Sequence, residues 1–164
     1  MRPVVVAVAL VALAACSSVP GRSESEAEPL SKEAFVEQAN RICRKTQAEA
    51  RGIAAPSLAD PRAVQESILE SASIQRRALR KLRDLEPPET DAPGIRNWLD
   101  LVDGTVDEME ALAQAVAAGD RDEMTSAIER GDALTADAEA FTAAYGLLDC
   151  TTEPPEEDEG QGEG

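Results

Sequence analysis

The amino-acid sequence predicts an all-α protein, folded as an antiparallel four-helix up-down bundle. The chain has 164 residues and is 43% hydrophobic but only 2% aromatic, so one modest domain with a core of Leu, Ile, Val and Ala is expected. Strong helix formers dominate, whereas the aromatic and β-branched clusters that mark strands are nearly absent beyond the N-terminus. Four apolar stripes recur at helical spacing and are joined by short connections, which force neighbouring helices to pack side by side.

The first predicted helix starts after Ser31, a residue that suits the N-cap position. Its apolar face, marked by three- and four-residue spacing, contains Phe35, Ala39, Ile42, Cys43, Ala50 and Ile53. The second helix begins at Asp60-Pro61, a capping residue followed by a proline at the first helical position. Its stripe contains Val64, Ile68, Ala72, Leu79, Leu82 and Leu85. The stretch EPPETDAP, residues 86–93, is expected to break the helix.

The third predicted helix stops near Gly119, because glycine is favoured just past a helix C-terminus. Its stripe contains Ile95, Trp98, Leu99, Val102, Val106, Met109, Leu112 and Val116. The fourth helix opens with Asp120 and Glu123, a pair that is similar to a capping box, and ends before Gly146. Its stripe contains Met124, Ile128, Leu134, Phe141 and Tyr145. We interpret the four stripes mainly as core, and the alternative is that part of them forms a pocket or groove for an apolar ligand.

The N-terminus, MRPVVVAVALVALAAC, has the proportions of a secretory signal peptide. A single charge at Arg2 precedes an apolar run that is shorter than the roughly 20 residues a membrane-spanning helix needs. A buried N-terminal strand or helix is the alternative. The segment Leu13-Ala14-Ala15-Cys16, which ends this run, resembles the lipobox of bacterial lipoproteins.

This resemblance implies export, transfer of a diacylglycerol to the Cys16 thiol and cleavage after Ala15, so residues 1–15 are predicted to be a lipoprotein signal peptide. Two acyl chains give stable attachment, and the protein is expected on the extracytoplasmic face of the cell membrane. The composition is also similar to that of small helical lipoproteins of actinobacteria. Behind the anchor we predict a flexible tether over residues 16–30, the bundle over residues 31–150 and a disordered acidic tail over residues 151–164.

Cys43 and Cys150 remain once Cys16 is assigned to lipid, and disulfides persist in an extracytoplasmic compartment. A Cys43–Cys150 disulfide is therefore predicted. In an antiparallel bundle the last helix ends near the start of the first, so residues 146–149 have to fold back along the first helix, and Gly146 makes this reversal feasible. The alternative is two free thiols, with Cys43 buried as a small apolar residue.

Two charged clusters complete the set of candidate sites. Five cations lie near the end of the second helix, namely Arg76, Arg77, Arg80, Lys81 and Arg83. Four carboxylates recur at helical spacing on the third, namely Asp100, Asp103, Asp107 and Glu110. Antiparallel packing brings the clusters together, so we interpret them as interhelical salt bridges. Two alternatives remain: the carboxylates could bind a divalent cation, and the cations could face anionic lipid headgroups.

The composition argues against most catalytic functions and against nucleic acid as a partner. A net charge of −16 repels phosphate backbones, and the absence of His removes the commonest metal ligand and general base. We therefore expect no enzymatic activity, no metal and no cofactor. The predicted function is a non-catalytic binding or interaction module, anchored in the cell envelope and facing an envelope protein. The alternative is a carrier that holds a small apolar ligand or lipid within the bundle.

Overall fold

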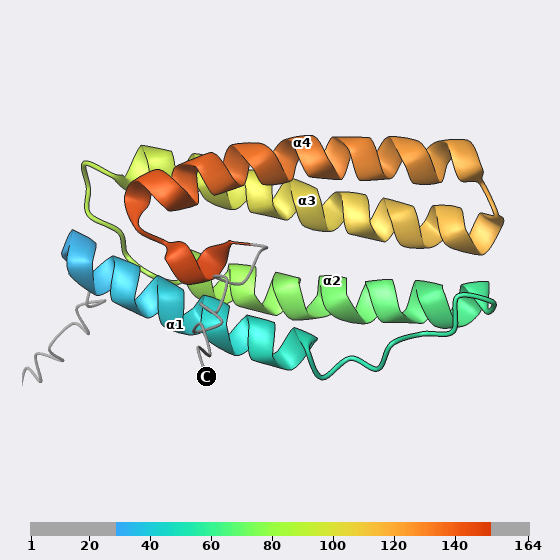
Figure 1. Cartoon of the computed structure of the whole chain (residues 1–164). Coiled ribbons are helices and arrows are strands. Elements are labelled where there is room, and N and C mark those ends of the chain that lie inside the picture. Colours follow the sequence, from blue (N-terminus) through green and yellow to red (C-terminus); the bar gives the residue numbers. More distant parts are fainter. Residues whose placement is uncertain (1–28, 152–164) are drawn as a thin grey trace, which may run out of the picture.

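The computed structural model describes residues 29–151 of the chain. The predicted signal peptide, Cys16, the tether up to residue 28 and the tail from residue 152 lie outside these residues. Within them, the chain forms α1 (Lys32–Ala50), α2 (Pro61–Arg83), α3 (Ala92–Ala118), α4 (Arg121–Tyr145) and the short 3-10 helix η1 (Leu148–Cys150). The four long helices run up and down in alternation (Figure 1), which confirms the predicted antiparallel bundle.

Side chains that the sequence marks as caps start three of the helices. Ser31 Oγ accepts a hydrogen bond from Ala34 N at the start of α1, and Asp60 accepts from Arg62 N and Ala63 N at the start of α2. Asp120 likewise accepts from Glu123 N at the start of α4. These bonds satisfy backbone donors that have no partner within the helix, and they fix where each helix begins.

Two glycines end α3 and α4 where the sequence predicts an end. Gly119 has φ 67° and Gly146 has φ 96°, so both adopt the left-handed conformation that glycine reaches without steric cost. Gly146 turns the chain back toward α1, and Leu147, the next residue, is fully buried. The end of α4 thus contains the chain reversal that a Cys43–Cys150 disulfide requires.

Three boundary details differ from the prediction. Ile53 and Leu85, assigned to the first two stripes, lie beyond the ends of α1 and α2. Gly52 disfavours continuation of α1, and Pro87 restricts the backbone that follows α2. Pro93, assigned to the breaking stretch, lies in the first turn of α3, where its missing N–H would have no helical partner anyway.

A cluster of buried apolar side chains lies toward the end of the bundle where α1 begins and α4 ends. α1 packs against α2 and η1, whereas α3 packs against both α2 and α4. Gly104 permits the close contact of α3 with α4, since a Cβ there would lie 3.1 Å from Leu134 Cδ1. The buried members of this core are Phe35, Ala39, Cys43, Leu79, Leu82, Ile95, Trp98, Leu99, Ala138 and Leu147.

Candidate functional site

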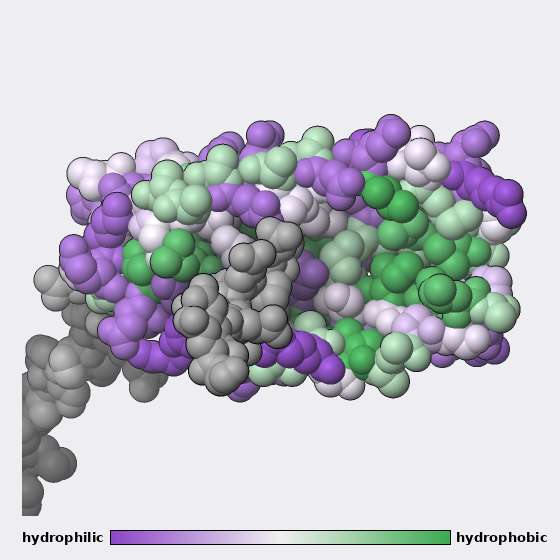
Figure 2. Space-filling view, viewed as in Figure 1, coloured by the Kyte–Doolittle hydropathy of each residue, from purple (hydrophilic) through white to green (hydrophobic). Residues whose placement is uncertain are grey.

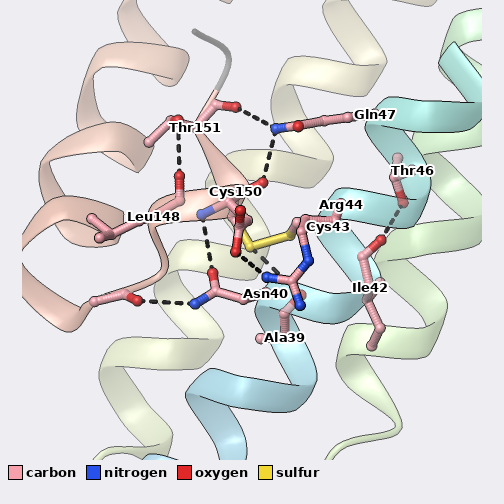
Figure 3. Close-up of a disulfide and its surroundings, with 12 residues drawn as sticks. Ala39, Asn40, Ile42, Cys43, Arg44, Thr46, Gln47, Leu148, Cys150 and Thr151 are labelled. Carbon is pink, nitrogen blue, oxygen red and sulfur yellow. Dashed lines mark hydrogen bonds and ion pairs between the residues drawn. A yellow bond between two sulfur atoms is a disulfide. The ribbon is translucent and has the colours of Figure 1, made fainter. Parts of the chain in front are cut away.

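A disulfide joins Cys43 of α1 to Cys150 of η1 (Figure 3), with the two Cα atoms 5.0 Å apart. This is the pair that the sequence leaves after Cys16 is assigned to lipid. The bond spans a sequence separation of 107 residues and attaches the end of the described chain to the middle of the first helix. The segment after α4 therefore fills the space between α1 and α4 (Figure 1).

Polar side chains on the same face of α1 hold this segment on either side of the disulfide. Asn40 Nδ2 donates to Gly146 O at 3.2 Å, and Asn40 Oδ1 accepts from Asp149 N at 3.1 Å. Gln47 Nε2 donates to Asp149 O at 2.9 Å and to Thr151 O at 3.2 Å (Figure 3). Arg44 also forms an ion pair with Asp149. Because positions 40, 43, 44 and 47 share one helical face, the whole row contacts the returning chain.

Tyr145, the last residue of α4, links α4 to the starts of α1 and α3. Its hydroxyl donates to Asp91 Oδ2 at 2.7 Å, its ring meets that of Phe35 edge-on at 6.2 Å, and Lys32 Nζ lies 4.3 Å from its centroid. Burial, followed by the hydrogen bond to Asp91 and the charge of that carboxylate, raises the pKa of Tyr145 above its ordinary value. The Asp91 carboxylate thus accepts a hydrogen bond from Tyr145, and it makes no side-chain hydrogen bond that caps α3.

Alkaline titration is expected to report this environment directly, because Tyr145 is the only tyrosine in the chain. Its phenolate absorbance should appear at a higher pH than in the unfolded chain, where the pKa is about 10. The folded state holds this proton more tightly than the unfolded chain does. The contribution of Tyr145 to the free energy of unfolding should therefore be complete below the unfolded pKa of about 10, and it should be lost as the pH rises from there through the folded pKa. Asp91→Asn should lower the midpoint only in part, and a midpoint identical in folded and unfolded protein would contradict the assignment.

The basic cluster of α2 divides into paired and unpaired members. Arg76 contacts three carboxylates of α3, with Nη1 2.8 Å from an Asp103 oxygen, Nε 2.8 Å from Glu110 Oε1, and Asp107 as the third partner. The hydrogen bonds to Glu110 and Asp107 raise the pKa of the Arg76 guanidinium. Arg83 pairs with Asp103 at 2.9 Å and Asp100 at 3.4 Å. For this face, the contacts support the interhelical salt-bridge interpretation.

Arg80 and Lys81 differ from these, because their side chains make no hydrogen bond or ion pair within residues 29–151. Arg77 makes one ion pair, at 3.4 Å to Glu49 of α1. With Arg83 and Asp84, these three cations line a shallow surface hollow of about 490 Å³ at the end of α2. The anionic-lipid interpretation stays a prediction for Arg80 and Lys81.

Arg76→Ala is expected to lower the free energy of unfolding by about 1 to 2 kcal/mol, because three carboxylates would lose their shared cation. The Arg76 side chain is 31% exposed, whereas that of Arg62, which pairs with Glu66 within α2, is 84% exposed. Arg62→Ala is the matched control and should change stability by less than about 0.5 kcal/mol. Urea unfolding at low and high salt would measure both, and equal effects of the two substitutions would show that the cluster adds nothing beyond a surface pair.

An apolar cavity of about 260 Å³ lies between α1, α2, α3 and η1. The disulfide forms part of its wall, and most of the remaining lining is contributed by α2 and α3, including Ala78, Leu79 and Trp98. Trp98 is 2% exposed and stacks on Phe141 at 6.0 Å, yet its Nε1 has no hydrogen-bond partner in the described part of the chain. Buried donors of this kind are rare in folded proteins.

A second apolar region continues from this cavity along α3, past the end of α1. The residues at 98, 102, 105, 109, 112 and 116 recur at alternating spacings of four and three, and so follow one face of α3. α1 ends at Ala50, before the far half of α3 (Figure 1), and Met109, Leu112 and Val116 on this face are only partly buried. Figure 2 shows apolar side chains gathered at that end of the molecule, where α3 turns into α4.

In this half of the bundle the core is made largely of small side chains, since Ala72, Ala113 and Ala127 are buried, whereas larger residues of the stripes are only partly buried. The stripes are thus mainly core, as interpreted, but part of them stays exposed. We call the uncovered portion the open apolar face. Ile128, in the second turn of α4 at this end of the bundle, is 49% exposed. Its partly exposed members are Val64, Ile68, Met109, Leu112, Val116 and Met124.

Comparison with protein-family models, curated proteins and solved structures finds no match to this chain. Among residues 29–151, no group of three or more His, Cys, Asp or Glu side chains is arranged to hold a metal ion, and no helix is long and apolar enough to cross a membrane. The fold and the site together define an all-α, antiparallel four-helix bundle with a C-terminal segment fixed by a disulfide, a small apolar cavity and an open apolar face.

Proposed function

We propose that the protein is a lipoprotein held on the extracytoplasmic face of the cell membrane through Cys16, with the bundle acting as a non-catalytic binding module. The lipobox-like segment Leu13-Ala14-Ala15-Cys16 supports the anchor. The Cys43–Cys150 disulfide supports the compartment, because disulfides persist outside the cytoplasm and are rare within it.

The anchor is tested by Cys16→Ala in cells that process lipoproteins. The unmodified protein is expected in the membrane fraction and to incorporate a labelled fatty acid, whereas the variant should lose the label and keep the precursor mass. Ser17→Ala is the matched control and should behave as the unmodified protein does. Label that persists in the Cys16→Ala protein would reject lipidation at this residue.

The open apolar face is the observation that carries the binding function. Apolar side chains gather at this end of the surface (Figure 2), and contiguous exposed apolar patches mark interaction sites. On this proposal, the face is covered by an apolar surface of an envelope protein, and the acidic exterior keeps the rest of the bundle soluble.

Site-specific photocrosslinking in intact cells tests this surface. A photoreactive side chain at Ile128 is expected to give an adduct of one defined mass, while the same group at the neighbouring exposed residue Glu129 should not. Equal adducts from both positions, or none from Ile128, would reject the open apolar face as the contact surface.

A carrier of a small apolar ligand is the second candidate, and the cavity beside Trp98 favours it. Its walls are mostly apolar and it lies among helices of a bundle, a common location for ligand sites. Native mass spectrometry of protein purified from its own membrane is expected to show a bound apolar molecule of defined mass. A spectrum with the bare protein alone would reject the carrier function.

A further inference from the structure

We propose that the outer face of α1 and α2, toward the end of the bundle where α1 begins, docks on a membrane surface of anionic phospholipid headgroups. The inference rests on the lipid anchor proposed above and adds the surface that meets the membrane. We call this face the basic surface, and it consists of Lys45, Arg77, Arg80, Lys81 and Arg83. Its placement, its unpaired cations and the position of the chain that leads to Cys16 support the proposal.

An ion pair between α1 and α2 places Lys45 beside the cations of α2. Arg77 Nη2 lies 3.4 Å from Glu49 Oε2, which fixes the register of the two helices at this point. The helices are antiparallel, so Lys45, one turn back from Glu49, lies level with the turn of α2 that follows Arg77. That turn carries Arg80 and Lys81. The basic surface therefore extends across both helices.

Three cations of the basic surface are unpaired, although the chain has 32 acidic residues against 16 basic ones. Lys45, Arg80 and Lys81 are exposed and make no side-chain hydrogen bond or ion pair within residues 29–151. Asp84 is the one carboxylate that lines the hollow with the cations of α2. Lys and Arg side chains bind phosphate oxygens strongly, and an unpaired cation can do so without the loss of an existing ion pair.

The chain that leads to Cys16 leaves the bundle beside this surface. Leu30 N donates to Glu86 O at 2.9 Å, so the start of the described chain lies against the turn that follows α2. Residues 16–30 span at most about 50 Å when fully extended, and a lipid on Cys16 confines the basic surface to that distance from the bilayer. The anchor thereby raises the effective concentration of headgroups at these cations.

Most of the acidic charge of the chain is too distant to cancel this attraction. At physiological ionic strength, exposed charges more than about 8 Å apart are largely screened from one another. The 27 residues of α3 extend over about 40 Å, so carboxylates at the far end of the bundle contribute little at the basic surface. The same arrangement holds the open apolar face, at that far end, away from the bilayer and free for an envelope protein.

Acetylation of Lys81 in the lipidated full chain tests the docking, because an amine in contact with headgroups reacts more slowly than one in water. The protein, purified from its own membrane, is inserted into vesicles of phosphatidylcholine alone or with about one third phosphatidylglycerol. Lys81 is expected to react at least about threefold more slowly on the anionic vesicles, and about 1 M salt should remove the difference. Equal rates on the two kinds of vesicle would overturn the proposal.

Two double variants of equal charge locate the contact. Lys45→Gln/Arg80→Gln removes two unpaired cations and keeps Lys81 as the reporter, so its rate on anionic vesicles should approach the rate on phosphatidylcholine. Arg62→Gln/Arg121→Gln is the matched control, since both residues are exposed in the first turns of α2 and α4, at the far end of the bundle. The control should keep the threefold difference, and equal behaviour of the two variants would overturn the basic surface as the contact.

Flotation separates failure of the anchor from failure of the docking. Protein that does not float with phosphatidylcholine vesicles lacks the anchor, which rejects the proposed lipoprotein and the docking with it. Protein that floats with both kinds of vesicle but shows equal Lys81 rates keeps the anchor and rejects the docking alone. Inorganic phosphate that slows Lys81 acetylation on phosphatidylcholine vesicles as much as phosphatidylglycerol does would indicate a site for a free anion and overturn the membrane assignment.

Discussion

Replacement of both Cys43 and Cys150 by alanine is expected to lower the free energy of unfolding by up to ~4.7 kcal/mol, the chain-entropy value for a loop of about 100 residues. The disulfide closes a loop over a sequence separation of 107 residues, so it constrains nearly the whole folded domain in the unfolded state. Small domains are stable by only about 5–15 kcal/mol, so the variant would lose a large share of its stability. Urea unfolding of the oxidised protein and the double variant measures the difference.

Two further measurements distinguish the effect of losing the S–S bond from the effect of replacing the two cysteine side chains by alanine. Reduction of the unmodified protein should reproduce the loss seen in the double variant, and the reduced chain should show altered electrophoretic mobility. Cys16→Ala is the matched control, since Cys16 is outside this pair, and it should unfold as the unmodified protein does. Thiol labelling of native, unreduced protein at Cys43 or Cys150 would contradict the bond itself.

The helices could be predicted from the sequence because their starts and ends depend on local interactions. Ser31, Asp60 and Asp120 accept hydrogen bonds from backbone N–H groups within the next three residues. Gly119 and Gly146 end helices through their own backbone conformation. None of these features needs a distant partner, so the pattern of residues is sufficient.

The sequence left a pocket or groove open as an alternative, but the positions of the cavity and of the open apolar face could not be predicted, because both depend on how far α1 extends over α3. The sequence places Trp98, Val102, Met109 and Leu112 on one continuous stripe, with nothing to distinguish its two halves. The difference arises where α1 ends at Ala50 and the chain leaves the bundle surface. The unequal helix lengths, α1 being shorter than α3, were the only signal available in advance.

For the charged clusters, the sequence predicts which helices pair but not which single residues do. Helical spacing predicts that cations of α2 meet carboxylates of α3, and Arg76 and Arg83 do so. It does not show that Arg80 and Lys81 remain unpaired among residues 29–151, because that depends on the rotation of α2 about its own axis. The hydrogen bond between Tyr145 and Asp91 was likewise hidden, since 54 residues separate them.

Phe35→Ala is expected to lower the free energy of unfolding by about 3–5 kcal/mol, the range for removal of a buried phenylalanine ring. Phe35 is 0% exposed and packs in the core with its ring against that of Tyr145. Leu58→Ala is the matched control, because Leu58 is 88% exposed and should change stability by less than about 0.5 kcal/mol. Urea unfolding of both variants gives the comparison, and a cost for Phe35→Ala close to that of the control would show that α1 is not fixed by this ring.

The cost of Phe35→Ala should also depend on the disulfide, because a cavity is expensive only when its surroundings cannot close over it. Cys43 holds α1 to η1 two turns after Phe35, so the helix cannot shift freely toward the space that the ring leaves. In the Cys43→Ala/Cys150→Ala background α1 can move, and the same substitution should cost less by about 0.5–1 kcal/mol. A double-mutant cycle measures this coupling. Strict additivity would mean that the disulfide acts only by restricting the unfolded chain and leaves the packing of α1 unchanged.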